Sequence, residues 1–263
     1  MKVTGILSLS KAVQLHYPFP VVVSSLSRMC CDVIVGVDPT HPEDRKVIES
    51  MGLPNIQIVD SVWDRENRKG GTEIAIKMDE LTALAKKQLS DWVVVMQADE
   101  VLHDKDFKRI NSFMERYIET DVNGFSMERV YFWKDLDTVR EDWQAKLVRV
   151  FKPGTYSFMA EGTDKSGMFS APTLHGSEIE LLSKIYHYSR VDTAEIISKR
   201  VRNLDSLFHA DETLIDVDSL PEYDFITREF DNFSKIQQPK KVKGKIVKFT
   251  DTHPPNVKEW YSE

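Results

Sequence analysis

Two adjacent acidic residues, Asp99 and Glu100, follow the apolar run 92–96, whose β-branched residues are typical of a buried strand. In an open α/β sheet, residues at the carboxyl end of a strand lie at the edge where ligands bind. Neighbouring carboxylates repel one another and favour a divalent cation such as Mg²⁺ or Mn²⁺, which prefers oxygen ligands. The pattern therefore indicates a metal site, although an acidic strand end that only faces water would carry the same residues.

Asp99 is the preferred ligand of the two acids. Because alternate residues of a strand point the same way, Asp99 shares a face with Gln97, and Glu100 points to the opposite face. We expect Glu100 to be a structural acid that holds the following loop. His187, in the aromatic segment 185–189, is a second candidate ligand, because imidazole completes many manganese sites. A histidine among aromatic residues can equally be a hydrogen-bonded packing residue.

Strand and helix patterns alternate along the first hundred residues, which must position these side chains. Apolar runs predict strands over 3–9, 32–38, 55–62 and 92–96, and helical spacing predicts helices over 42–52 and 72–89. Residues 21–29 form a further apolar segment, helical or extended. Thr40 and Glu43 have the spacing of a capping box before the helix that contains Pro42. This order predicts a parallel sheet covered by helices.

The second half of the chain changes character. Helices are predicted over 106–117 and 193–209, and aromatic β-type segments over 125–133, 146–151 and 185–189. The segment 235–248 is rich in lysine. It is either a solvated arm or an arm that contacts phosphate.

The composition is that of an ordinary globular protein. The chain has 263 residues, of which 41% are hydrophobic and 29% charged, enough for one large α/β core. The net charge of −7 excludes a global basic field that would draw the protein to nucleic acid or membrane. No apolar run approaches the ~20 residues of a membrane span, and the N-terminus lacks a signal-like core. Cys30 and Cys31 are adjacent, a poor disulfide pair, so we expect a reducing, cytoplasmic location.

The segment 91–102, Asp-Trp-Val-Val-Val-Met-Gln-Ala-Asp-Glu-Val-Leu, resembles nucleotide-sugar glycosyltransferases of the family 2-like, GT-A class, as does Gly70-Gly71-Thr72-Glu73. Less specific blocks follow in order at 148–151, 186–188 and 249–254. The resemblance implies a GT-A (Rossmann-like) α/β fold with a mixed, mostly parallel sheet flanked by helices, an aromatic-rich acceptor half and a helical C-terminal extension.

The same resemblance implies one catalytic domain, 1–234, followed by a lysine-rich tail, 235–263. Within the domain we expect a nucleotide-sugar-binding half over 1–120, an acceptor and catalytic half over 121–190, and a helical extension over 191–234.

In the resembled class an Asp-x-Asp-like motif holds the metal on the donor diphosphate. Here Gln97 stands in place of the first acid, so we expect weak or substrate-dependent binding of Mn²⁺ or Mg²⁺ at Asp99 and His187. The Gln97 amide can still bind the donor by a hydrogen bond to a ribose or sugar hydroxyl. The other donor-binding residues implied by the resemblance are Asp38, Asp64, Arg68, Lys69 and Gly71. The two aspartates could equally be capping or loop acids, and the two basic residues solvated loop charges.

The implied reaction is displacement at the anomeric carbon of a UDP- or GDP-linked sugar, with inversion. Such a transfer needs a carboxylate within reach of the acceptor's proton. The candidates, in order of preference, are Asp164, Glu161 and Asp142, each of which could be a loop acid instead. Trp133, Trp143 and Tyr156 could stack on an acceptor ring or belong to the core. The acceptor is open: a glycan, a lipid-linked sugar, a protein, or a modified base in DNA reached through the lysine-rich tail.

Two other classes compete with this interpretation. A sugar-phosphate nucleotidyltransferase shares the strand order and the metal carboxylates, but it usually has a glycine-rich loop after the first strand, and 8–12 contains no glycine. A P-loop enzyme is excluded because no Gly-x-x-x-x-Gly-Lys run occurs. A catalytically degenerate nucleotide-binding module is favoured by Gln97 and disfavoured by the presence of Asp99, His187 and the paired glycines.

Overall fold

The computed structural model describes residues 1–67, 71–141, 145–158, 177–208 and 246–262. Its strands are β1 (Val3–Leu9), β2 (Asp32–Val37), β3 (Ile56–Asp60), β4 (Trp92–Val95), β5 (Glu100–Leu102), β6 (Val122–Arg140), β7 (Lys146–Phe151), β8 (Ser177–Val191) and β9 (Ile246–Lys248). Its helices are α1 (Phe19–Met29), α2 (Pro42–Ser50), α3 (Thr72–Lys87), α4 (Asp104–Tyr117), α5 (Ala194–Phe208) and α7 (Val257–Trp260).

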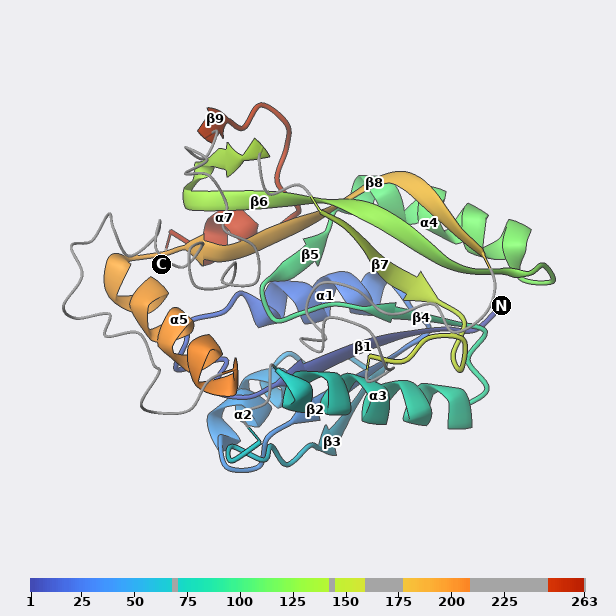
Figure 1. Ribbon diagram of the computed structural model, residues 1–263, viewed down its shortest axis with the longest axis horizontal. Coiled ribbons are helices and arrows are strands. Elements are labelled where there is room, and N and C mark those ends of the chain that lie inside the picture. The colour runs from blue at the N-terminus through green and yellow to red at the C-terminus, as the bar shows by residue number, and fades with distance from the viewer. Residues whose placement is uncertain (68–70, 142–144, 159–176, 209–245, 263) are drawn as a thin grey trace.

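The strands form one mixed sheet in the order β3-β2-β1-β4-β7-β6-β8-β5, with β9 paired to β6 (Figure 1). Strands β3, β2, β1 and β4 are parallel. Every residue of β1 and β4 is buried, as expected for parallel strands covered on both faces. The predicted α/β fold with a mixed sheet flanked by helices is confirmed.

Alternate residues of the parallel strands pack into two cores on opposite faces of the sheet. Leu7 of β1 joins Leu26 of α1 in the larger core, which also includes residues of α2 and α4. Ile6 joins Met78 and Leu81 of α3 in the smaller core. Because successive strand residues point to opposite faces, α1 and α3 pack on opposite faces of the sheet. The carboxyl edge of the parallel strands is then left for a ligand-binding site.

The second half of the sheet is built on two long strands, β6 and β8, which run side by side in parallel (Figure 1). β7 joins them to the first half through antiparallel pairing with β4 and β6, and β5 pairs antiparallel with β8. The end of the chain packs on this half: β9 extends β6, and His253 lies 3.0 Å from the Tyr188 hydroxyl and 2.9 Å from the Leu136 carbonyl. None of the helices described is long and apolar enough to cross a membrane.

The structure changes two local expectations and decides a third that the sequence left open. The capping box was wrong: α2 begins after His41, and the Thr40 hydroxyl donates to Asp38 instead of capping the helix. The segment 21–29 lies in helix α1. Strand β4 ends at Val95, and 97–100 is a turn closed by a 3.1 Å bond from the Glu100 N–H to the Gln97 carbonyl. Strand alternation therefore does not govern the directions of the residues in this turn.

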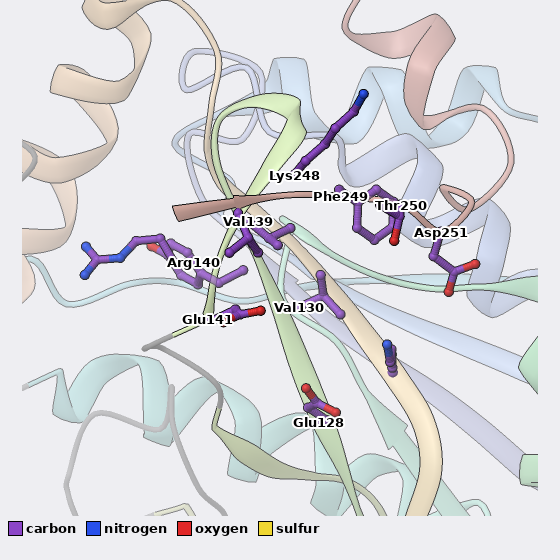
Figure 2. A pocket seen from close by; sticks show the side chains of 12 residues that line it. Glu128, Val130, Val139, Arg140, Glu141, Lys248, Phe249, Thr250 and Asp251 are labelled. Carbon is purple, nitrogen blue, oxygen red and sulfur yellow. The ribbon is translucent and has the colours of Figure 1, made fainter. Parts of the chain in front are cut away.

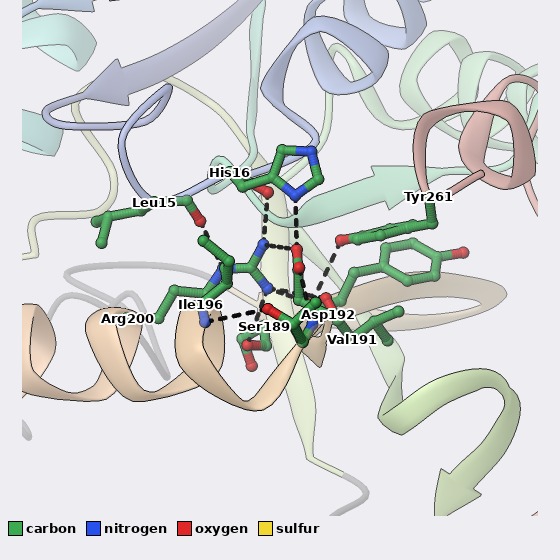
Figure 3. A network of polar contacts seen from close by, with 10 residues as sticks. Leu15, His16, Ser189, Val191, Asp192, Ile196, Arg200 and Tyr261 are labelled. Atoms are coloured by element: carbon green, nitrogen blue, oxygen red, sulfur yellow. Dashed lines mark hydrogen bonds and ion pairs between the residues drawn. The ribbon is translucent and has the colours of Figure 1, made fainter. Parts of the chain in front are cut away.

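Arg200 of α5 joins the first half of the chain to the end of β8 (Figure 3). Its guanidinium donates to the carbonyls of Leu15 at 2.8 Å and Val191 at 3.0 Å, and it also reaches the carbonyls of His16, Tyr188 and Ser189. The buried carboxylate of Asp192 accepts from Arg200 at 3.0 Å and lies 2.7 Å from the His16 ring nitrogen. The Arg200 guanidinium thus supplies hydrogen bonds to carbonyl groups from two segments that are distant in the sequence.

Replacing Arg200 with alanine is expected to lower the free energy of unfolding by about 3 kcal/mol or more, because it leaves a buried carboxylate and several carbonyls without their donor. Urea denaturation followed by circular dichroism measures the change. Lys199→Ala, on the exposed side of the same helix, is the control and should leave the midpoint nearly unchanged. Equal midpoints for wild type and the Arg200 variant would contradict this role.

Candidate functional site

A buried ion pair fixes the turn between β4 and β5. Glu100 is fully buried, and its two carboxylate oxygens accept bonds of 2.8 and 2.9 Å from the Arg149 guanidinium on β7. One of these oxygens also accepts from the Gln97 N–H at 3.2 Å. Glu100 is therefore the structural acid that the sequence predicts, but the prediction was wrong in one detail: this bond holds the preceding turn, not the following loop.

The same turn brings Asp99 to His187, the two predicted metal ligands. The Asp99 carbonyl accepts from the Tyr188 N–H at 2.9 Å, and Glu100 pairs in register with His187 across β5 and β8. The Nε2 atom of His187 lies 3.6 Å from Oδ1 of Asp99. Both residues are buried. Strand pairing thus joins two segments that are far apart in the sequence.

Burial and nearby charges set the protonation of this pair. Burial raises the pKa of Asp99, the Glu100 carboxylate raises it further, and nearby arginines lower it, to give a pKa of about 6. Burial lowers the pKa of His187 well below its ordinary range, and four buried arginines lower it further: Arg129, Arg190, Arg149 and Arg200. At neutral pH the imidazole is neutral and keeps a lone pair, as a metal ligand must.

The His187 ring has two further neighbours. Its Nδ1 atom lies 3.3 Å from the Ser189 hydroxyl, which lies 2.9 Å from the Tyr131 hydroxyl. The Tyr131 ring packs on the imidazole with a centroid separation of 4.7 Å. All three side chains are buried. The orientation of His187 is therefore fixed by contacts on both ring nitrogens and on one face.

Asp99 and His187 fit a divalent cation as two members of its ligand set. Ligands ~2.0–2.2 Å from one ion can be ~3–4 Å apart, which accommodates the observed separation. No group of three His, Cys, Asp or Glu residues within the described ranges could hold a metal. The remaining ligands would be water or substrate oxygens, as is usual for Mg²⁺. Because these two side chains leave most coordination positions of a cation open, the pair suits a cation that binds together with the oxygens of a polyanion.

Asp38 lies at the carboxyl end of β2, on the predicted donor side. Its carboxylate accepts from the Ser10 hydroxyl at 2.8 Å and from the Thr40 N–H and hydroxyl at 3.1 and 2.8 Å. Arg65 lies 3.7 Å away. Burial raises the pKa of Asp38, but these bonds and the Arg65 charge outweigh it, and the pKa is lowered. An ionised carboxylate is thus held at the edge where open α/β sheets bind ligands.

Asp64 and Gly71 lie at the two ends of the loop before α3. Asp64 is exposed; its N–H donates to the buried Glu73 at 2.9 Å, and its carboxylate accepts from the Glu66 N–H at 3.0 Å. Gly71 has a φ of 72°, a left-handed conformation that glycine adopts readily, and its N–H donates to the Leu207 carbonyl. The residue of this loop that contacts Asp38 is Arg65, which no spacing in the sequence singles out.

Several predicted residues lie outside the described ranges and stay predictions: Arg68, Lys69, Asp142, Trp143, Glu161 and Asp164, with 235–245 of the lysine-rich segment and its expected contact with DNA. Trp133 and Tyr156 are buried. Trp133 packs against Arg140, and Tyr156 packs against Phe151. These two aromatic residues therefore belong to the core, the alternative that the sequence left open.

A small cavity lies between β6 and the 247–251 segment (Figure 2). Its lining combines apolar side chains, such as Val130 and Phe249, with charged ones, such as Glu128 and Lys248. Its volume of about 210 Å³ is below the ~300–1,000 Å³ of typical small-molecule sites. We therefore do not assign a nucleotide sugar to it.

No family model and no curated protein matches the chain. Among solved structures, Staphylococcus aureus TarS (residues 1–349) is 13% identical, with a TM-score of 0.46 over 90% of this chain and 74% of that one. A putative nucleotide-diphospho-sugar transferase from Desulfovibrio desulfuricans is 12% identical, with a TM-score of 0.44 over 88% and 96%. A 4-diphosphocytidyl-2C-methyl-D-erythritol synthase from Anaerococcus prevotii is 13% identical, with a TM-score of 0.46 over 76% and 94%. The similar structures thus include a nucleotide-diphospho-sugar transferase, but at these values we base no functional assignment on them.

Replacing Glu100 with glutamine is expected to lower the free energy of unfolding by about 3 kcal/mol, because the buried Arg149 charge loses its counter-ion. Chemical denaturation monitored by tryptophan fluorescence measures this loss. Glu115→Gln, an exposed change on α4, serves as the matched control. If both variants unfold at the same denaturant concentration, the ion pair does not hold the turn.

Proposed function

We propose that this protein is a glycosyltransferase that moves a sugar from a UDP- or GDP-linked donor to an acceptor, with Asp99 and His187 as ligands of a divalent cation. The observation that carries the proposal is the 3.6 Å approach of the Asp99 carboxylate and the neutral His187 imidazole beside the end of β4. The resemblance of 91–102 to the GT-A class supports the same assignment. Mn²⁺ and Mg²⁺ are the cations that suit this pair.

The site residues that the structure describes are proposed to have the following roles. Asp99 and His187 bind the cation, which when bound offsets the charge that develops on the departing diphosphate. Asp38, held ionised and buried with Arg65 3.7 Å away, is proposed to accept a hydrogen bond from the nucleoside. Asp64, Gly71 and Gln97 are proposed as further donor-binding residues, together with Arg68, which lies outside the described ranges.

The acceptor's proton requires a base, for which we propose Asp164 first and Glu161 second, in an inverting transfer. The segment that contains them follows Phe158. Asp79 of α3 anchors that point: its carboxylate accepts from the Phe158 N–H at 2.9 Å and from the Ser157 hydroxyl at 2.8 Å. Ser157 and Phe158 therefore lie beside α3, the helix that follows the loop between Asp64 and Gly71.

The loop after β1 argues against a nucleotidyltransferase. Such an enzyme would use free backbone N–H groups in this loop to bind phosphate. Here the N–H groups of Ala12 and Val13 donate to the fully buried carboxylate of Asp44, at 2.9 and 2.7 Å. Those donors are already engaged, and a second anion beside Asp44 would be repelled.

Asp99→Asn is expected to lower the rate of donor turnover about 100-fold or more, because a charged cation ligand becomes a neutral amide. The assay follows release of UDP or GDP from a panel of nucleotide sugars with Mn²⁺, without acceptor and with candidate acceptors. Asp121→Asn, an exposed change, is the control. Near-normal turnover in the Asp99 variant would contradict the assignment, and a wild-type protein that binds but never cleaves a donor would favour a binding module.

The binding of Mn²⁺ is expected to depend on the nucleotide. Asp99 and His187 would supply only two ligands, and a bound diphosphate would supply further oxygens. The dissociation constant for Mn²⁺, measured by electron paramagnetic resonance of the free ion, should therefore fall at least tenfold when UDP or GDP is present at saturation. Mixtures of Mn²⁺ and nucleotide without protein correct for direct association. An unchanged dissociation constant would mean that the two ligands do not share a site.

A further inference from the structure

We infer that Ser189 and Tyr131 are positioning residues that hold His187 in the tautomer with its proton on Nδ1, which leaves Nε2 to bind the cation beside Asp99. The inference rests on the proposed function, since it concerns the same cation. It adds two residues that neither the sequence motifs nor the resemblance indicated.

Only one of the two His187 ring nitrogens has a partner within hydrogen-bond distance among the described residues. The separation between His187 Nδ1 and Ser189 Oγ, 3.3 Å, is a long hydrogen bond, whereas 3.6 Å between Nε2 and Asp99 Oδ1 is too long for one. A neutral imidazole has one N–H, and that proton goes where a partner is within reach. The geometry therefore puts the proton on Nδ1 and leaves two lone-pair atoms, Nε2 and Oδ1, side by side.

Tyr131 gives the Ser189 hydroxyl an acceptor, which allows the bond between His187 and Ser189 to run from the imidazole to the hydroxyl. A hydroxyl can donate one hydrogen and accept two bonds. With the Tyr131 oxygen 2.9 Å away, Ser189 can donate to Tyr131 and so accept from His187 Nδ1. Without that oxygen, the Ser189 hydrogen can turn toward Nδ1, which would move the imidazole proton to Nε2 and block cation binding.

The three side chains are buried, which strengthens the effect of these hydrogen bonds on the His187 tautomer. Tyr131, His187 and Ser189 are 3%, 5% and 8% exposed, so water has little access to replace a lost bond. The Tyr131 ring also packs on the imidazole and fixes its plane. Partners of this kind on metal-binding histidines typically change metal affinity 10–100-fold when they are removed.

The test measures the dissociation constant for Mn²⁺ by titration calorimetry, with UDP or GDP present, on the full chain. Ser189→Ala should raise this dissociation constant 10–100-fold. Ser189→Thr, which keeps the hydroxyl, should have a dissociation constant close to that of the wild type. Tyr131→Phe, which keeps the ring, should raise the dissociation constant less than Ser189→Ala does. Ser183→Ala is the matched control, because Ser183 is a buried serine of the same strand whose hydroxyl oxygen has no hydrogen-bond partner among the described residues. An equal rise in the control would overturn the inference.

A second measurement needs no metal. The ¹⁵N shifts of a histidine-labelled protein report the tautomer, with the His187 signals identified by their loss in His187→Gln. The wild type should show the proton on Nδ1, and Ser189→Ala should shift it toward Nε2. If His187→Gln weakens Mn²⁺ binding but Ser189→Ala changes neither the binding nor the ¹⁵N shifts, the positioning role is overturned and the proposed function stands. If His187→Gln leaves Mn²⁺ binding unchanged, His187 is not a ligand, and the proposed cation site fails as well.

Discussion

The buried pair between Glu100 and Arg149 is the interaction on which the site depends. A carboxylate with no exposed surface is tolerated only when its charge and its oxygens are matched, and Arg149 supplies both through two bonds. The pair joins β5 to β7 and closes the turn that carries Asp99. β5 also pairs with β8, with Glu100 in register with His187, and this pairing puts the turn that carries Asp99 beside that histidine. Removing the pair would leave the turn held by the pairing of β5 with β8 and by the bond from the Tyr188 N–H to the Asp99 carbonyl.

The two halves of the sheet contribute different chemistry. The parallel half, β3-β2-β1-β4, provides a carboxyl edge with an ionised Asp38 and the acidic turn after β4. The half built on β6, β7 and β8 provides His187 and three of the four arginines around it. Asp99 and His187, the two proposed cation ligands, come together where the halves meet. Two ligands leave positions for oxygens of another molecule, which is the physical reason to propose a metal-bound diphosphate as the ligand.

The sequence predicted the elements well because apolar periodicity is a local property. The first four strands, helix α3 and the short strand β7 follow directly from runs of apolar residues. Residue type alone also selected Asp99 and His187. The alternation used to orient Asp99 failed, because β4 ends at Val95 and a turn follows. The backbone of that turn is held by the Arg149–Glu100 pair and by the bond from the Tyr188 N–H to the Asp99 carbonyl, so the strand period does not apply there.

The residues that the sequence could not reveal are those defined by distant partners. Arg149 was visible only as part of a weak block, and its role depends on a carboxylate in another strand. Arg65 contacts Asp38 from a loop with no distinctive spacing. Ser189 and Tyr131 are ordinary residues of two strands until the pairing of β6 with β8 puts their hydroxyls together. Side-chain contacts across a sheet depend on the register of the paired strands, which cannot be predicted from a single sequence.

The most direct measurement is a crystal structure of the full chain grown with Mn²⁺ and UDP or GDP, with anomalous scattering used to locate the manganese. The account predicts one manganese ion bound to Oδ1 of Asp99, Nε2 of His187 and oxygens of the nucleotide's diphosphate. A manganese ion bound elsewhere, or a diphosphate bound away from Asp99, would contradict it.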